Sequence, residues 1–400
     1  MLYLQMYRKG VFIMKKYTIK ALAAMLLAAS ILSFSACGKD NNSSEASTAD
    51  SSVSAVSDTS KENDSSSTDE ESSEQSDDNS KPEASDPIDE KEKGDLPPLA
   101  DDDGSDVGIM TDGGILIYNR TAYEMFYGNE SLAKDYADAV STVKKALGDK
   151  VKVYNVVVPT HCGVTLPDRF FDEYGITDQN EYIKTIFDSY SEDIVGINTY
   201  NTIAHHRDEY IYFNSDHHWT GLAAYYAYRD FCKTAGVEPL KLSEMIEGTI
   251  EGYYGSLTNW VDASLLEPDV VHYFTAEKDT ETFIYDDNGE NEQQTRLFHD
   301  YAEGANAYGV FLGGDNPLTV CRNKDGNGKK IAILKESYGN AFSPYIALTY
   351  SETHMLDFRY LEFDFLKYIE DNNIDEVIIV NNTMASATPM RCDELRGLVD

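Results

Sequence analysis

From residue 331 to residue 340 the chain reads Ile-Ala-Ile-Leu-Lys-Glu-Ser-Tyr-Gly-Asn, and this stretch decides the fold. The continuous apolar run over 331–334 predicts a buried strand, and the pattern after it is helical through Tyr350. Ser337 therefore lies at a strand-to-helix turn. A serine there is well placed as a nucleophile, because the N–H groups of the helix N-terminus stabilise negative charge and the sheet edge leaves its Oγ exposed.

Strands and helices alternate on both sides of this turn. Sequence patterns predict strands over 115–118, 151–158, 354–358 and 376–380, and helices over 132–147, 182–190 and 362–372. This alternation predicts an α/β fold whose mainly parallel sheet is covered by helices on both faces. Residues 240–330 are rich in Gly, Asn and Asp and predict an inserted loop or hairpin region. Ligands of such folds bind beyond the carboxyl ends of the strands.

A second segment carries more reactive side chains than any other part of the chain. Residues 214–220 read Asn-Ser-Asp-His-His-Trp-Thr and follow a predicted strand over 210–213, while the helix that starts after Thr220 is expected to end at Gly236. Asp216 and His218 are two residues apart, so both side chains point the same way in an extended segment and the carboxylate can fix the imidazole tautomer.

Three predicted strands end beside candidate residues. Phe213 precedes the Asp-His segment, Leu334 precedes Ser337, and Val380 precedes Asn381. Since the carboxyl ends of parallel strands share one edge of the sheet, we expect these groups to meet at one rim.

The segment Asp216-His217-His218-Trp219 resembles the DHHW family of bacterial surface proteins, and its core is similar to that of alginate O-acetyltransferases with SGNH-hydrolase-like domains. The resemblance implies a three-layer α/β/α domain whose motif order is circularly permuted, with the Asp/His segment before the serine. It implies that Ser337 attacks an acyl carbonyl, that His218 takes its proton and that Asp216 holds His218. Glu336 stands where the family has an aspartate that shapes the turn.

Further residues are candidates for the oxyanion hole or for substrate contacts. The N–H group of Ser337 is the first expected donor, and an asparagine after the last strand resembles the one of SGNH enzymes. The other candidates lie near predicted strand ends, in a Gly-Gly turn or next to Asp216 and His218. The set comprises Asn381, Asn382, Gly313, Gly314, Asn316, Arg359, Tyr360, Tyr338, His217 and Trp219.

Less specific interpretations stand beside these. A serine after a strand is often only a helix cap, and Trp219 can pack behind His218 rather than contact a ligand. His205 and His206, with the 216–218 segment, form an alternative zinc site, but no His-Glu-x-x-His spacing supports it, so we expect no metal and no cofactor.

The first 37 residues resemble a lipoprotein signal peptide. Met14 is the expected start, the charged residues after it precede an apolar run over 21–32, and small residues precede Cys37, the expected lipidation site. The run is shorter than the roughly 20 residues that a membrane span needs. We therefore expect an extracytoplasmic domain, anchored to the membrane through Cys37; an uncleaved anchor is the alternative.

Residues 38–106 predict a disordered tether. From 39 to 106 the chain has 22 acidic and 5 basic residues and no aromatic residue, so it cannot bury enough apolar area to offset its conformational entropy. The domain over 107–400 has 48 acidic and 23 basic residues, a balance that opposes nucleic-acid binding. Cys162, Cys232, Cys321 and Cys392 allow two disulfides or remain reduced.

These patterns leave three classes of function. The first is a serine-dependent O-acetyltransferase or esterase acting on a cell-surface or extracellular polysaccharide, with a membrane acyl-transfer partner as an open question. The second is a glycan- or substrate-binding lipoprotein on the same fold, and the third is an inactive scaffold. The many tyrosines are consistent with a sugar-binding surface, although aromatic residues also fill cores.

Overall fold

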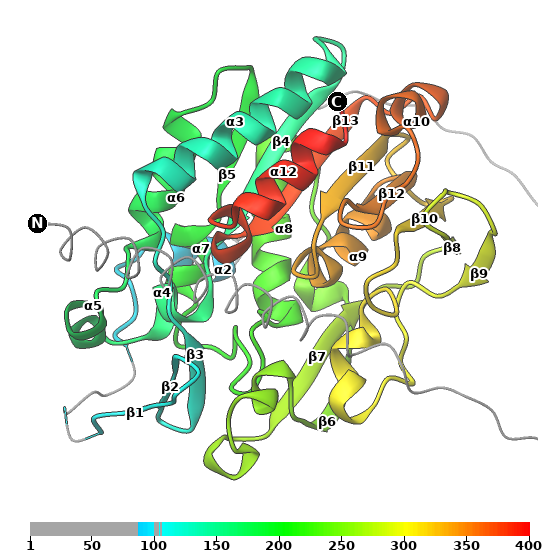
Figure 1. Ribbon diagram of the computed structural model, residues 1–400. Coiled ribbons are helices and arrows are strands. Elements are labelled where there is room, and N and C mark those ends of the chain that lie inside the picture. Colours follow the sequence, from blue (N-terminus) through cyan, green and yellow to red (C-terminus); the bar gives the residue numbers. More distant parts are fainter. Residues whose placement is uncertain (1–86, 100–103, 105) are drawn as a thin grey trace, which may run out of the picture. The chain divides into compact units, whose positions relative to one another are not determined.

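The structure, a computed structural model, describes residues 87–99, 104 and 106–400 (Figure 1). The predicted signal peptide with Cys37 and most of the predicted tether lie outside these residues. Among the described residues, no helix combines the length and apolar character that a membrane span requires.

An eight-stranded sheet forms the centre of the domain. Its strand order is β5-β4-β13-β11-β12-β10-β8-β9. The five strands from β5 to β12 are parallel to one another, and the last three continue the sheet in antiparallel pairs. The bounds are β4 Lys152–Val158, β5 Ile194–Asn198, β8 Thr280–Tyr285, β9 Gln293–Thr295, β10 Leu318–Asn323, β11 Lys330–Lys335, β12 Glu352–Asp357 and β13 Glu376–Asn382.

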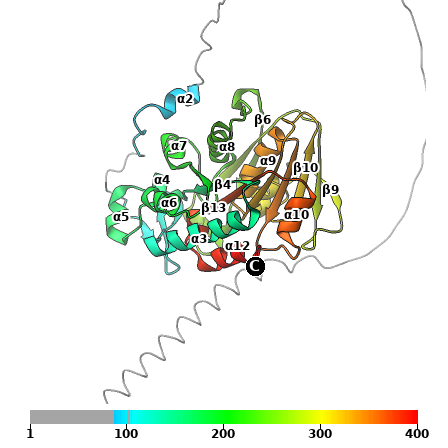
Figure 2. The ribbon, with the colours of Figure 1, turned by 90° about the horizontal axis from the view of Figure 1, so that it is seen from above.

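Helices cover both faces of this sheet, as Figure 2 shows from above. Alternate residues of each parallel strand enter one of two hydrophobic clusters, because side chains of a strand point to opposite faces. One cluster packs against α3 (Glu130–Leu147), α6 (Gln179–Asp188), α10 (Phe365–Asp371) and α12 (Pro389–Gly397). The other packs against α7 (Tyr200–His205), α8 (Gly221–Ala235) and α9 (Gly339–Thr349). The expected three-layer, SGNH-hydrolase-like α/β/α fold is confirmed.

Short elements complete the domain at the end where the parallel strands finish. They are the sheet of β1 (Ile109–Met110), β2 (Ile115–Tyr118) and β3 (Thr121–Glu124), the sheet of β6 (Ile246–Tyr253) and β7 (Asp269–Thr275), the helices α4 (His161–Thr165), α5 (Asp168–Tyr174) and α11 (Thr383–Ser386), and the 3-10 turns η2 (Leu242–Glu244), η3 (Ser256–Asn259), η4 (Ala263–Leu265) and η5 (Gly304–Val310).

The prediction of a separate insertion over 240–330 is wrong in part. Only the β6–β7 pair stands apart, whereas β8, β9 and β10 belong to the main sheet. β10 pairs with β12 along five residues, from Leu318 with Leu356 to Arg322 with Glu352. The Gly-, Asn- and Asp-rich turns around β10 resemble a surface hairpin in sequence, yet the strand is buried on both faces between β12 and β8.

The end of the predicted tether is structured. The helix α2 (Pro87–Glu92) lies within residues 38–106, and Arg229 of α8 donates to Glu92 at 2.7 Å and to Asp89 at 2.5 Å. These ion pairs hold α2 on the domain, although its composition alone predicts a solvated chain. The four cysteines of the domain are buried and unpaired, so the alternative of two disulfides is not realised.

Candidate active site

Ser337 lies in the turn between β11 and α9, as the apolar run before it predicts. Its Oγ is 2.8 Å from Nε2 of His218. The turn is tight, because Gly339 N–H donates to the Glu336 carbonyl and Asn340 N–H donates to the Ser337 carbonyl. Within the described residues the Ser337 N–H has no hydrogen-bond partner. That N–H group is therefore available to an oxygen atom bound next to Oγ.

The segment before His218 is a loop and not the predicted strand over 210–213. It forms a single bridge, between Tyr212 and Trp219, because the chain turns back on itself over 214–218. Asp269 of β7 holds this turn, accepting from the N–H groups of Asn214 at 2.7 Å and Ser215 at 2.8 Å. Burial raises the pKa of Asp269. The loop is thus fixed by a residue that lies far away in sequence.

Asp216 and His218 form the pair that their spacing predicts. Asp216 Oδ1 is 2.6 Å from His218 Nδ1 and also accepts the His218 N–H at 2.9 Å. Its second oxygen accepts the Ser256 N–H at 2.7 Å. Burial alone would raise the pKa of Asp216, but the imidazoles of His218 and His217 and these hydrogen bonds hold it well below its ordinary value. The carboxylate is therefore ionised and orients His218 so that Nε2 faces Ser337.

Aromatic rings confine the His218 imidazole. Tyr308 of η5 stacks on it with ring centroids 4.0 Å apart, and its hydroxyl donates to the Ser337 carbonyl at 3.0 Å. His217 lies on the imidazole at 3.9 Å, with its Nδ1 2.6 Å from Ser256 Oγ. Among the described residues His217 makes no hydrogen bond to Ser337, and burial lowers its pKa.

Glu336 shapes the serine turn, as the family position implies. One carboxylate oxygen accepts the Tyr338 N–H at 3.0 Å and lies 3.3 Å from Ser337 Oγ. The other accepts the N–H and the side-chain amide of Asn382 at 3.1 and 3.2 Å. Glu336 thus joins the turn to the end of β13, and its carboxylate is a second acceptor near the serine hydroxyl.

Arg359 belongs to a charged cluster beside the same turn. Its guanidinium donates to Asp357 at 2.7 and 2.6 Å and lies 2.8 Å from Asp315. Lys335 also contacts Asp357, at 3.1 Å, and Asn340 donates to Asp315 at 2.8 Å. Burial would lower the pKa of Arg359, but the two carboxylates raise it. The Arg359 guanidinium is thus bound by the Asp357 and Asp315 carboxylates, and within the described residues it makes no hydrogen bond to Ser337.

Other predicted contact residues are placed elsewhere. Asn381 is fully buried and its Oδ1 accepts from Tyr136 of α3 at 2.8 Å, so its side chain enters the core instead of reaching Ser337. Tyr338 is also buried, and its N–H is occupied by Glu336. Trp219 donates to the Tyr338 carbonyl at 2.9 Å and packs behind the pair, which matches the alternative structural interpretation.

The Gly-Gly segment is a turn. The N–H groups of Gly313 and Gly314 donate to backbone carbonyls of the preceding residues, and the amide of Asn316 donates to the Leu312 carbonyl at 2.8 Å. Tyr360 is 40% exposed and lies against Arg359. The N–H groups of Gly313 and Gly314 and the bonded amide of Asn316 are therefore engaged and do not act as oxyanion donors in this arrangement.

In the described part of the chain, one group has the spacing of metal ligands, namely Asp216, His217 and His218, whose ligand atoms lie within 4.8 Å of one another. These atoms are engaged in the hydrogen bonds given above. His205 and His206 do not join them, because His205 contacts the Asn201 carbonyl and His206 contacts Glu209. The arrangement therefore suits proton transfer between side chains.

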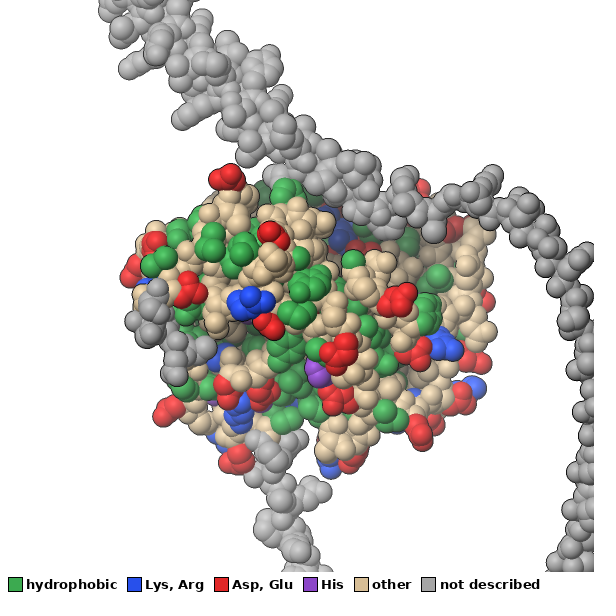
Figure 3. All heavy atoms as spheres, turned by 90° about the horizontal axis from the view of Figure 1, so that it is seen from below, with side chains coloured by type: hydrophobic (Ala, Val, Ile, Leu, Met, Phe, Trp, Pro, Cys, Tyr) green, Lys and Arg blue, Asp and Glu red, His purple; other side chains and the backbone are tan. Residues whose placement is uncertain are grey.

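Sequence reasoning did not find Tyr308, Ser256, Asp269 or Gly255, although all contact the Asp216–His218 loop. They come from the region interpreted as an insertion, and no local motif marks them. Figure 3 shows the face where the parallel strands end, where a histidine side chain reaches the surface between hydrophobic and acidic side chains.

The fold and the order of its site residues define an SGNH-hydrolase-like α/β protein. The model of the DHHW protein family matches residues 39–356, so the chain belongs to the DHHW family. A DHHW family protein from Eubacterium siraeum is 26% identical, with a TM-score of 0.67 over 75% of this chain and 98% of that one. PatB1 of Bacillus cereus, solved with a sulfonyl adduct, is 19% identical, with a TM-score of 0.59 over 69% and 97% of the two chains. No curated protein matches the sequence.

Proposed function

We propose that this protein is a serine-dependent O-acetyltransferase or esterase that acts on a cell-surface or extracellular polysaccharide. The observation that carries the proposal is the continuous hydrogen-bonded chain from Ser337 through His218 to Asp216, at the end of the sheet where ligands of such folds bind.

In the proposed reaction, Ser337 Oγ forms a bond to the acyl carbonyl carbon while its proton passes to Nε2 of His218. Asp216 stabilises the imidazolium, and the Ser337 N–H donates to the oxygen that gains negative charge. Collapse of the tetrahedral intermediate breaks the bond to the leaving oxygen, which takes the proton from His218. A sugar hydroxyl or water then discharges the acyl-enzyme by the reverse steps.

The proposal includes the location of the reaction. The signal-peptide pattern before Cys37 and the acidic tether support a lipid-anchored enzyme outside the cytoplasm, held at a distance from the membrane. Such an enzyme needs an acyl donor on its own side of the membrane, and a membrane acyl-transfer partner would supply one.

A non-catalytic glycan-binding lipoprotein is the second candidate. One observation favours it, namely the Glu336 carboxylate 3.3 Å from Ser337 Oγ, because a negative charge beside the serine opposes formation of an oxyanion there.

Turnover of p-nitrophenyl acetate by the purified chain and by Ser337→Ala separates these candidates. We expect a wild-type burst and steady turnover that Ser337→Ala abolishes. Turnover that persists in Ser337→Ala, or no turnover by the folded wild type, contradicts the enzyme. Mass spectrometry of cell-surface polysaccharide with and without the protein then shows whether acetyl groups are added or removed.

A further inference from the structure

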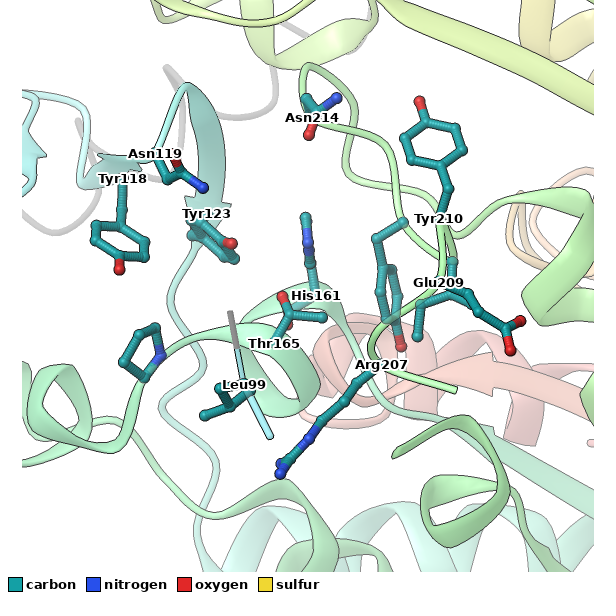
Figure 4. Close-up of a pocket in the computed structure, with 13 residues that line it drawn as sticks. Leu99, Tyr118, Asn119, Tyr123, His161, Thr165, Arg207, Glu209, Tyr210 and Asn214 are labelled. Carbon is teal, nitrogen blue, oxygen red and sulfur yellow. The ribbon is translucent and has the colours of Figure 1, made fainter. Parts of the chain in front are cut away.

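A cavity of about 160 Å³ lies beside the loop that carries Asp216, and Ser337 is not among its lining residues. Figure 4 shows how it is enclosed by Tyr123 of β3, His161 of α4 and Tyr210 and Asn214 of the loop, with Arg207 and Leu99 on one side. A water molecule occupies roughly 30 Å³ in the liquid, so the cavity has room for about five waters or one sugar ring.

Flat aromatic rings form one wall of this cavity. His161 stacks on Tyr212 and lies against Tyr123, with ring centroids 4.8 and 4.5 Å apart. Burial lowers the pKa of His161 to about 3, so the ring is neutral. The hydroxyls of Tyr212 and Tyr210 donate away from the cavity, to the Pro159 carbonyl and to Asp269. The stacked rings cover one another's faces, and the Tyr210 and Tyr212 hydroxyls are bound elsewhere, so this wall is apolar, as is suitable for the C–H groups of a sugar.

Two side chains at the cavity, Arg207 and Asn214, have donors without a partner among the described residues. Arg207 uses its Nε on the Pro97 carbonyl, which leaves its two terminal amines. Asn214 accepts from Thr121 through its side-chain oxygen at 2.9 Å, which leaves its amide NH₂. Glu209, the one carboxylate among the lining residues, is neutralised by Lys91 at 2.6 Å and also bound by other donors. A ligand that satisfies these two side chains must supply acceptor oxygens.

We infer that the cavity is a subsite for one pyranose unit that carries a carbonyl acceptor, either an acetamido group or a carboxylate. That this pyranose belongs to a polysaccharide rests on the proposed function, because the cavity holds one ring and the rest of a glycan would lie outside it. Asn214 lies two residues before Asp216 in the same anchored loop, so a glycan held at this subsite contacts the loop that carries the reactive pair.

Two probes distinguish the sources of the carbonyl, namely tetra-N-acetylchitotetraose and tetragalacturonate. We would record saturation-transfer difference spectra of each with the full chain. Leu99→Trp places an indole into the cavity from its rim, and Leu96→Trp is the matched control, because Leu96 is in the same segment, 46% exposed, and does not line the cavity. We expect at least one probe to bind wild type and Leu96→Trp, and to lose its signal with Leu99→Trp.

The inference is overturned if neither tetrasaccharide binds the wild type, or if Leu99→Trp binds them as well as the wild type does. If Leu99→Trp lowers the melting temperature, Arg207→Met decides, since it removes the terminal donors without filling the cavity; unchanged binding then also overturns the inference. Turnover of p-nitrophenyl acetate is recorded in parallel, because it needs no glycan. Absent turnover with intact, Leu99-dependent binding rejects the proposed reaction and keeps the subsite.

Discussion

Gly255 leaves no room for a side chain beside Asp216. We therefore expect Gly255→Ala to impair catalysis although Ser337, His218 and Asp216 themselves are unchanged. A Cβ at residue 255 would lie 2.2 Å from the Asp216 Cβ and 2.4 Å from its Oδ2. Carbon atoms in contact are normally about 3.5–4.0 Å apart. Since Asp216 is 2% exposed and bound on both oxygens, it cannot move into solvent.

The size of the effect follows from the displacement. To restore normal contact, Asp216 and residue 255 must separate by more than about 1 Å. The 2.6 Å bond between Asp216 and His218 cannot accommodate such a shift. A misplacement of about 1 Å at a reacting group costs on the order of 10²-fold in rate. We also expect a loss of about 1–3 kcal/mol in the free energy of unfolding from overpacking.

The assay is kcat for p-nitrophenyl acetate, measured with urea unfolding of the same samples. Gly397→Ala is the matched control, because a Cβ there meets no atom within 4 Å. We expect the control to match the wild type in both measurements. A Gly255→Ala protein with wild-type kcat and stability would refute the reasoning, since it would show that the loop moves freely around Asp216.

Three further predictions concern the surroundings of the site. Tyr308→Phe keeps the ring on the imidazole but removes one hydrogen bond to the serine turn. Since such a bond contributes about 1 kcal/mol, kcat should fall by about tenfold or less. Asp357→Asn leaves Lys335 without its buried anion, and urea unfolding should show a loss of about 3–5 kcal/mol; a change below 1 kcal/mol would contradict this. Burial would lower the pKa of His206, but Glu209 and Glu92 raise it above 6.5. Its proton therefore stabilises the folded chain below pH 6.5, and this stability is lost as pH rises through the raised pKa. In unfolding followed from pH 5 to 9, His206→Gln should lack that step, and an unchanged profile would count against it.

Local patterns were enough to predict β4, β11, β12 and β13 and the two reactive segments, whereas the parallel edge strand β5 was not predicted. The apolar runs before Ser337 and over 151–158 are long and bounded by turn residues, and they correspond to β11 and β4. Thr220 and Gly236 cap α8 as expected, because their side-chain and backbone chemistry acts over a few residues.

The remaining part depends on contacts between distant residues. The turn over 214–218 is held by Asp269 and Ser256, about forty to fifty-five positions later, and no periodicity links them to it. Asn381 was predicted to follow a strand that ends at Val380, but β13 runs on to Asn382, and strand alternation places the Asn381 side chain in the core on the α3 side with Ile379. Sequence patterns locate this strand, but neither the residue at which it ends nor the face that each side chain takes there.

The most direct test of the central claim is covalent labelling by a serine-directed fluorophosphonate, located by peptide mass spectrometry of the folded chain. We predict one adduct, on Ser337, which is absent in Ser337→Ala and forms much more slowly in His218→Gln. Labelling of Ser337 at the same rate in His218→Gln, or no adduct on Ser337 in the wild type, would contradict the claim that these three residues act as one reactive chain.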